Sequence, residues 1–356
     1  MSKPAGQAEA APGARAGMIT GITGQDGSLL ARLLLEKGYS VTGTTRNLAS
    51  TDFWRLEELG IRTHPKLEIV ELDVADPAGC AEVVAEARPE ELYNVAGVSF
   101  IGRSLEDPLG AARVTGLGAW NLLEAIRTRC PNTRYFQAST SEMFGYAGDS
   151  PQDEETRFNP GTPYAVAKVF AHSATMTYRQ AFGVFASSGI LYNHESPLRS
   201  DEFVTRKIAC AAARISKGMQ ESVELGNLDA QRDWGYAPEY AEAMWRTLQA
   251  PSGDSYILAT GRLTTVRRFV DAAFRAAGIG LHWQGHGVGE KGIDDAGKSR
   301  VKVSAAYFRP AESRPLCGNP VKSRRLLGWE ARTGAEELSR IMVEAELKRI
   351  EAGRAQ

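Results

Sequence analysis

The sequence lacks the features that mark secreted and membrane-spanning proteins. It contains no run of about 18 apolar residues, so no transmembrane helix is predicted. Residues 1–17 have no apolar core of the kind that a signal peptide needs, and their Ala, Gly and Pro content predicts a disordered leader. The four cysteines are scattered without a CxxC pair, a pattern typical of reduced thiols. We therefore expect a cytoplasmic protein with no membrane partner.

A strong charge of either sign is also absent. With 42 basic and 43 acidic residues, the formal net charge is −1, so we expect no nucleic-acid partner, and any anion site must be local. A set of metal ligands is missing as well. His282 and His286 have the i,i+4 spacing of ligands on a helix, but Gly285 and Gly287 argue against a helix there, and no cysteine or carboxylate set joins them. No metal site is predicted.

Folded sequence is expected to begin with a short strand, a glycine-rich turn and a helix. Residues 17–20 form the strand, residues 21–27 read GITGQDG, and leucines recur on one helical face before Gly38. The glycines let the backbone approach a pyrophosphate, which the helix N-terminus binds through free N–H groups. The G-x-x-G-x-x-G spacing, although not the commoner G-x-G-x-x-G, still predicts a dinucleotide site. The predicted cofactor contacts are Gly21, Thr23, Gly24, Gln25, Asp26 and Gly27.

The end of the next predicted strand, at 40–44, indicates which dinucleotide binds. Arg46 follows this strand, where an Asp or Glu would bind a free ribose 2′-hydroxyl. A guanidinium accommodates a 2′-phosphate instead, so the sequence favours NADP over NAD. Asp73, after the third strand, is placed to meet the adenine amino group. Further cofactor contacts are predicted at Val74, Ala96, Tyr164, Lys168 and His194, with His194 alternatively orienting Asn193.

Strands and helices alternate up to about residue 190, which predicts an α/β fold with a Rossmann-type, doubly wound parallel sheet. At 356 residues and 43% hydrophobic content, the chain can bury the core of one large domain or two intimate ones. We expect an NADP-binding domain over residues 18–195, with a helix at about 236–250 added to it. Residues 196–350 are expected to form a smaller, interleaved C-terminal α/β substrate lobe, in which the Gly-rich stretch 285–299 is a mobile loop.

A tyrosine and a lysine four residues apart mark a candidate catalytic helix. Tyr164 and Lys168 share one helical face, so the ammonium can lie under the phenol and lower its pKa, which would make the phenol a general base. Thr140 and Glu142 close the fifth strand, at the sheet edge where ligands bind. Each has an ordinary alternative, because Tyr-x-x-x-Lys occurs by chance, Thr140 can cap a turn, and Glu142 can be a solvated carboxylate.

Motifs along the whole chain resemble those of the GDP-mannose 4,6-dehydratase family, a group of extended short-chain dehydrogenase/reductases. They are GITGQDGS at 21–28, QASTSEMFG at 137–145, TPYAVAK at 162–168, NHESP at 193–197, FVTRKI at 203–208, RDWG at 232–235 and YFRPAE at 307–312. The resemblance covers roughly residues 18–350. The later motifs carry most weight, because related epimerases and reductases share the turn and the Tyr–Lys pair but not HESP or YFRPAE.

The resemblance implies a lyase that converts GDP-mannose to GDP-4-keto-6-deoxy-mannose. Tyr164 would take the 4-hydroxyl proton as hydride passes to NADP, Glu142 would remove the C5 proton, and water would leave from C6 before the hydride returns. The implied catalytic residues are Thr140, Glu142, Tyr164 and Lys168. The implied substrate contacts are Thr140 and Glu142 together with Ser99, Asn193, Lys207, Arg232, Arg309 and Glu312. A homodimer or a homotetramer is implied as well.

Two departures from the family pattern leave alternatives open. Residues 94–101 read NVAGVSFI where the family has NLAAQSHV, so Val98 and Phe100 replace polar side chains near the sugar end of the site. The loop after Arg46 is less basic than the family's Arg-Arg-Ser run, although Arg55 is retained, which leaves dimer and tetramer open. The alternative functions are the same chemistry on another GDP-sugar such as GDP-mannoheptose, a 4-epimerase or 4-oxidoreductase of a GDP-sugar, and a non-catalytic NADP sensor.

Overall fold

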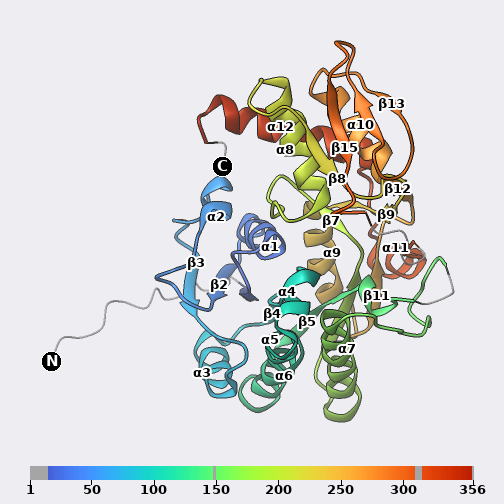
Figure 1. Ribbon diagram of the computed structural model, residues 1–356. Coiled ribbons are helices and arrows are strands. Elements are labelled where there is room, and N and C mark those ends of the chain that lie inside the picture. The colour runs from blue at the N-terminus through green and yellow to red at the C-terminus, as the bar shows by residue number, and fades with distance from the viewer. Residues whose placement is uncertain (1–14, 147–149, 309–314, 355–356) are drawn as a thin grey trace.

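The structure is a computed structural model that describes residues 15–146, 150–308 and 315–354. The predicted leader therefore lies almost wholly outside the described residues. The strands of the main sheet are β1 (Ala16–Thr20), β2 (Ser40–Thr45), β3 (Leu67–Glu71), β4 (Glu91–Asn94), β5 (Arg134–Thr140), β6 (Ala186–Leu191) and β11 (Ser255–Leu258). All pair in parallel, in the order β11-β6-β5-β4-β1-β2-β3 (Figure 1). The predicted Rossmann-type fold is confirmed.

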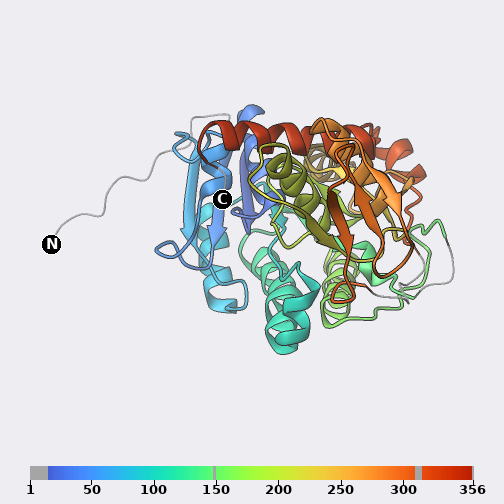
Figure 2. The ribbon, with the colours of Figure 1, turned by 45° about the horizontal axis from the view of Figure 1, so that its top comes forward.

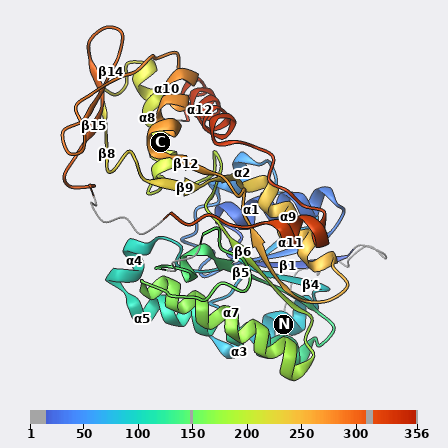
Figure 3. The same cartoon turned by 90° about the vertical axis from the view of Figure 1, so that its right-hand side faces the viewer.

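Helices cover both faces of this sheet (Figure 3). On one face lie α1 (Gln25–Glu36), α2 (Trp54–Glu58), α9 (Ala237–Gln249) and α11 (Val321–Leu327). On the other lie α3 (Pro77–Ala87), α4 (Ile101–Glu106), α5 (Pro108–Ala111), a π-helical turn (Ala112–Leu117), α6 (Gly118–Arg129) and α7 (Pro163–Phe182). Strands with helices on both faces are shielded from water on both sides, and β4 and β6 are buried along their whole length although they carry Glu91, Asn94, Ser187 and Ser188.

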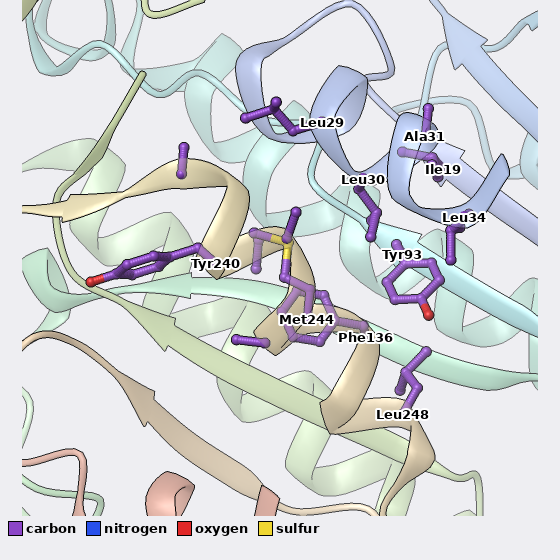
Figure 4. Packing of buried hydrophobic residues seen from close by; sticks show 14 of the residues in the cluster. Ile19, Leu29, Leu30, Ala31, Leu34, Tyr93, Phe136, Tyr240, Met244 and Leu248 are labelled. Carbon is purple, nitrogen blue, oxygen red and sulfur yellow. The ribbon is translucent and has the colours of Figure 1, made fainter. Parts of the chain in front are cut away.

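The core of the main lobe lies where α1 and α9 pack together over the sheet (Figure 4). Helical spacing predicts that Leu29, Leu30, Leu33 and Leu34 share one face, and of these Leu33 is only partly buried. The other three are buried against Ile19, Tyr93 and Phe136 of the sheet and Tyr240, Met244 and Leu248 of α9. Burying one such side chain stabilises the fold by roughly 1.5–3 kcal/mol. The core therefore holds the start of α1, and with it the glycine-rich turn, in a fixed position at the end of β1.

A second lobe has its own hydrophobic core. Its elements are α8 (Val204–Ser216), β8 (Val223–Leu225), α10 (Val266–Ala276), β13 (His282–Gln284), β14 (Lys291–Ile293), β15 (Ser299–Val303) and α12 (Ala335–Glu351). In Figure 2, α12 extends from this lobe toward the first strands of the main sheet. There Arg349 Nε on α12 lies 3.2 Å from Glu58 Oε1 of α2.

The structure corrects the prediction that residues 285–299 form a mobile loop. Strands β14 and β15 pair antiparallel, and β13 pairs with β14. Gly297 has a φ of +78°, which a tight turn requires, and the Asp294 carboxylate accepts the N–H groups of Ala296 and Lys298. The glycines that favoured a loop are the turn residues of a hairpin.

The chain passes between the two lobes more than once. After α8 and β8 it returns through β9 (Gln231–Asp233) and β10 (Gly235–Tyr236) to α9 and β11 of the main lobe, and then leaves again through β12 (Leu263–Thr265). Two small pairings tie these crossings together, β10 with β7 (His194–Glu195) and β12 with β9. Strand β11 was not predicted, because its four residues follow the lobe crossing rather than a βα repeat.

Candidate active site

A cleft of about 670 Å³ lies at the carboxyl ends of β1, β2 and β4. Most of the predicted cofactor residues line it: Gly21, Thr23, Gly24, Gln25, Asp26, Gly27, Arg46, Val74 and Ala96. Two of the glycines are sterically required. Gly21 has a φ of +70°, and a Cβ there would lie 3.0 Å from Ala96 Cα. A Cβ on Gly27 would collide with the Gly21 carbonyl oxygen, so these glycines keep the turn close to the start of α1.

The turn is fastened to β7 by buried polar side chains. Gln25 donates from Nε2 to the His194 carbonyl (3.1 Å) and accepts from the Ser196 hydroxyl at Oε1 (2.8 Å). His194 Nε2 lies 3.0 Å from Asp26 Oδ1, and its Nδ1 lies 2.7 Å from the Tyr192 carbonyl oxygen. The ring stacks on Tyr240 with centroids 4.6 Å apart. His194 is thus the ion-pair partner of Asp26 and does not orient the Asn193 side chain.

The pKa values of this pair move apart. Burial acts to raise the pKa of Asp26, but the charges of His194 and Arg199 outweigh it and hold that pKa well below its ordinary value. Burial acts to lower the pKa of His194, but Asp26 outweighs it and the net pKa is raised. Both shifts favour the charged forms, so the pair holds the turn electrostatically.

Two arginines that the sequence analysis did not assign to the cofactor also line the cleft. Arg55 donates from Nη1 to the Thr23 carbonyl (3.1 Å), from Nε to the Leu198 carbonyl (2.7 Å) and from Nη2 to the Ser200 hydroxyl (3.0 Å). Arg199 pairs with Glu195 (3.1 Å) and lies over the Phe203 ring. Only retention of Arg55 was noted from sequence, and no spacing signal distinguishes Arg199 from other loop arginines.

Tyr164 and Lys168 lie on the buried face of α7, which Thr162 caps by accepting the Ala165 N–H (3.1 Å). Lys168 Nζ donates to the Ala138 carbonyl at the end of β5 (2.6 Å). Burial lowers the pKa of Lys168 to about 8. Burial also raises the pKa of Tyr164, while a side-chain hydrogen bond with Thr140 opposes the increase. The expected lowering of the Tyr164 pKa by Lys168 is therefore wrong, because desolvation is the larger effect.

Thr140 and Glu142 follow β5 beside this pair. Thr140 Oγ1 accepts the Glu142 N–H (3.3 Å) and caps a short 3-10 turn, η2 (Ser141–Met143), so its capping role is real. Burial raises the pKa of the Glu142 carboxyl, and the charge of Arg232 on β9 partly opposes that shift. Glu142 is thus not an ordinary solvated carboxylate. The structure brings Thr140, Glu142 and Tyr164 of the main lobe together with Arg232 of the lobe crossing.

Comparison with known proteins identifies the family of the chain. Residues 18–342 match the family model described as GDP-mannose 4,6 dehydratase. The GDP-mannose 4,6-dehydratase of Sinorhizobium fredii is 45% identical over 343 residues, which cover 95% of this chain and 98% of that protein. The GDP-mannose 4,6 dehydratase 2 of Caenorhabditis elegans is also 45% identical, over 94% of this chain and 90% of that protein.

The chain belongs to the GDP-mannose 4,6-dehydratase family. It is accordingly a lyase. Solved structures support the fold. A dTDP-glucose 4,6-dehydratase from Bacillus anthracis, in complex with NAD, has a TM-score of 0.78 at 18% identity, covering 95% of this chain and 98% of that chain. RMD from Pseudomonas aeruginosa, in complex with NADPH, has a TM-score of 0.73 at 20% identity, covering 94% and 99%.

The remaining residues that the family resemblance implied are spread around the site. Asn193 follows β6 and accepts the Gly235 N–H on its carbonyl (2.9 Å), and Lys207 on α8 lies over the Tyr307 ring with its Nζ 4.0 Å from the centroid. Ser99 lines the cofactor cleft, whereas Asp73 and His194 do not. Arg309 and Glu312 lie outside the described residues. Among the described residues, no group of three His, Cys, Asp or Glu side chains is placed to hold a metal ion.

The segment that departs from the family pattern forms an apolar part of the cleft. Val98 lines the cleft and donates its N–H to Thr115 Oγ1 (3.1 Å). Phe100 packs edge-on against Phe203, with ring centroids 6.0 Å apart, and the Arg199 guanidinium lies over the Phe203 ring. Phe100 therefore contacts the wall that Arg199 and Phe203 form, whereas Val98 lines the same cleft next to Thr115. No described helix has the length and apolar character that a membrane crossing requires.

Proposed function

We propose that this protein removes water from GDP-mannose and gives GDP-4-keto-6-deoxy-mannose, with NADP as its cofactor. The observation that carries the proposal is Glu142, a carboxyl with a raised pKa beside Thr140 and Tyr164. An epimerase or a 4-oxidoreductase of a GDP-sugar needs a base for the 4-hydroxyl, but elimination needs a second base for the C5 proton. A carboxyl whose pKa is raised is suited to both accept and return a proton.

The cleft fits a dinucleotide with a 2′-phosphate. The start of α1 offers backbone N–H groups and the positive end of the helix dipole, and Gly21, Gly24 and Gly27 leave no side chain in the way. Arg46 lines the cleft after β2. Asp52 is a carboxylate that also lines the cleft, but it accepts the Trp54 N–H (2.9 Å) at the start of α2. These features support NADP over NAD.

The bound nicotinamide would accept hydride from sugar C4 and later return it at C6. Tyr164 takes the proton of the 4-hydroxyl, and this proton replaces the one lost from C5 when the hydride returns at C6. The hydrogen bond from Thr140 and the charge of Arg199 both lower the pKa of Tyr164 and so favour the phenolate against burial. Lys168, whose pKa is lowered to about 8, can exchange a proton near neutral pH at the end of β5.

Glu142 performs the elimination. The 4-keto group makes the C5 hydrogen acidic, and Glu142 takes that proton as its carboxylate. The same carboxyl group then gives the proton to the departing 6-hydroxyl, which leaves as water, with Thr140 assisting. Arg232, which lowers the pKa of Glu142, keeps enough of the carboxylate present for the first of these steps.

We assign the sugar nucleotide to the second lobe, with Asn193, Lys207, Arg232, Arg309 and Glu312 as its contacts. Lys207 lies on α8 of that lobe, and Arg232 lies on β9, which leads back to the main lobe. Guanidinium groups bind pyrophosphate oxygens well. The division into an NADP-binding domain over 18–195, with the helix at about 236–250 added to it, and an interleaved substrate lobe over 196–350 follows from this assignment.

We also propose a homodimer through the face of α5, the π-helical turn and α7. Leu109 (78% exposed), Val166 (55%), Leu117 (49%) and Phe170 (41%) crowd this face, and the last three line an apolar groove of about 640 Å³. Exposed apolar surface of this kind marks protein contacts, and a second copy brings a matching apolar face. Light scattering of Val166→Glu, which we expect to give monomers, tests this contact.

The function is tested by incubating the purified protein and NADP with GDP-mannose, GDP-mannoheptose, and UDP- and dTDP-sugars. We expect GDP-mannose to lose the mass of one water and to give a 4-keto product. Loss of water from GDP-mannoheptose alone would move the substrate assignment to the heptose and connect it to Val98 and Phe100. A product of unchanged mass would favour an epimerase, and no product from any sugar would contradict the proposal.

A further inference from the structure

A second cavity, of about 530 Å³, lies on the far side of the wall that bounds the cofactor cleft. Its charged lining is unusually basic, with five arginines and three carboxylates. The arginines are Arg55, Arg199, Arg206, Arg349 and Arg354, and the carboxylates are Glu57, Glu58 and Asp201. Trp54 and Ser200 complete the lining. None of the roles proposed above uses Arg206, Arg349 or Arg354.

Two of these arginines are almost fully buried and have spare donors. The side chains of Arg206 and Arg349 are 8% and 7% exposed. Both pair with one oxygen of the buried Glu346, at 2.9 Å from Arg206 Nη2 and 3.4 Å from Arg349 Nη1. Among the described residues, Arg206 Nη1 and Arg349 Nη2 have no hydrogen-bond partner. The Glu346 carboxylate is thus shared by two buried guanidinium groups, and each of them keeps N–H donors for which the described residues supply no acceptor.

The other carboxylates do not remove this excess. Asp201 pairs with Arg206 (3.2 Å), and its side chain is 70% exposed, so water weakens the pair. Glu58 faces both Arg349 (3.2 Å) and Arg354 (3.5 Å). The Arg354 side chain, which is 67% exposed, pairs with Glu58 at the rim of the cavity and can turn from it toward a ligand. A small oxyanion fits such a site, since guanidinium forks match its oxygens.

We propose that this arginine cavity binds an oxyanion of the phosphate class, either free phosphate or the phosphate of a nucleotide, at a site separate from the cofactor cleft. Arg55, Arg199 and Ser200 line both cavities, and Arg55 also holds the Thr23 carbonyl of the glycine-rich turn. Two anions that share these cations compete for them. Occupancy of the arginine cavity therefore weakens cofactor binding, and the cofactor weakens phosphate binding by the same factor. This coupling rests on the proposed function, whereas phosphate binding does not.

The test is calorimetric titration of the full chain with inorganic phosphate at constant ionic strength set by chloride. We expect saturable binding at one site. Arg354→Met weakens it and Glu58→Gln tightens it, each by about threefold or more, because the first removes a donor and the second removes a competing carboxylate. Arg340→Met, the same change on exposed α12 surface outside the cavity, leaves binding unchanged.

Absence of saturable binding overturns the proposal, as does an equal effect of Arg340→Met, which would indicate general charge attraction. Loss of binding in Arg46→Met but not in Arg354→Met also overturns it, because Arg46 lines the cofactor cleft and not the arginine cavity, so the phosphate then occupies the cleft. Titration with GMP separates a nucleotide from free phosphate as the source. If phosphate binds as expected but NADP does not bind at all, the cofactor assignment fails and the arginine cavity stands.

Discussion

The glycine-rich turn and the end of β5 each place a carboxyl group at the same crevice, and the two groups differ in their neighbours. Asp26 lies 3.0 Å from His194 and close to Arg199, and its pKa is held well below the ordinary value. At Glu142 burial raises the pKa, and the charge of Arg232 opposes that shift only in part. Desolvation is the largest single effect on both groups, so the presence of a charged partner decides between them.

The difference separates a carboxylate that holds structure from one that moves protons. A permanently ionised Asp26 fastens the turn to β7 through His194 at all ordinary pH values. A carboxyl with a raised pKa, such as Glu142, exchanges a proton at lower cost near neutral pH. Substituting each of the two carboxyl groups in turn is therefore the most direct test of this difference.

The largest effect is expected for Glu142→Gln. An amide cannot take the C5 proton, so we expect turnover to fall by about 10³-fold, within the range for loss of a general base. Stability should stay the same or rise slightly, because a buried charge is removed. Product formation by mass spectrometry measures turnover, thermal unfolding measures stability, and transient NADPH absorbance follows the C4 oxidation.

Glu155→Gln is the matched control, because Glu155 is exposed on the next loop. It should leave turnover within about twofold, as expected for a surface change. Transient NADPH absorbance in Glu142→Gln would show that C4 oxidation still proceeds. Full turnover in this variant would remove Glu142 from the mechanism.

Tyr164→Phe tests the base for the 4-hydroxyl. We expect turnover to fall by roughly 10²-fold or more, and the transient NADPH signal to be lost, because the first proton transfer is blocked. This second readout distinguishes it from Glu142→Gln. Turnover that is insensitive to Tyr164→Phe would contradict the assignment and favour the NADP-sensing alternative.

Asp26→Asn should show the opposite profile, with a large loss of stability. It leaves the buried His194 without its ion partner, and breaking such a pair costs about 3 kcal/mol. The exposed pair of Asp295 and His282, which lie 2.9 Å apart, provides the control, and Asp295→Asn should change the free energy of unfolding by under about 0.5 kcal/mol. Equal losses in urea unfolding would contradict the structural role of Asp26.

The stability lost in Asp26→Asn should also depend on pH. The lowered pKa of Asp26 gives stability above the unfolded value of about 3.9 that disappears as the pH falls. The raised pKa of His194 gives stability below the unfolded value of about 6.5 that disappears as the pH rises through the folded value. The difference between wild type and variant is therefore greatest between these two values.

A smaller effect is expected from Arg46→Asp, which tests the cofactor assignment at the turn. The change removes the cation proposed to bind the 2′-phosphate and supplies a carboxylate for a 2′-hydroxyl. We expect the ratio of NADP to NAD affinity to fall by about tenfold or more. Fluorescence titrations with both cofactors measure the ratio, and an unchanged ratio would count against Arg46 as the discriminating residue.

The smallest effect concerns the acid limb of the pH–rate profile. Since burial raises the pKa of Glu142, kcat should fall on acidification at a pH above the ordinary range of a glutamate. Arg232→Met removes a charge that lowers this pKa, so the acid limb should move to still higher pH. A shift in the other direction would show that the limb belongs to another group.

Local patterns were sufficient to predict most of the main lobe. The turn at 21–27, the strand ends and the buried face of α7 all follow from short-range spacing, and the sheet confirms the predicted architecture. The partner of Asp26 could not be found in this way, because His194 is distant in sequence and its role depends on β7 lying beside α1. The same holds for Arg199 and for strand β11.

The pKa of Tyr164 could not be predicted from spacing either. The i,i+4 relation with Lys168 places both side chains on one face but says nothing of how much water that face excludes. In the structure Lys168 Nζ bonds the Ala138 carbonyl, and burial acts on both side chains. The extent of desolvation depends on the packing of the whole site, so it cannot be predicted from the spacing of two residues.

The repeated crossing of the chain between the lobes limits how the crevice can move. Segments 191–204, 225–237 and 258–266 all run from one body to the other, and the pairs β7–β10 and β9–β12 tie them side by side. A single hinge residue cannot open such a connection, because each crossing would have to bend in register with its neighbours. Neither body is a contiguous stretch of chain, so a circular permutation or an excised half would cut the other core. The crevice should therefore be nearly rigid, and access to it should depend on the loops at its rim.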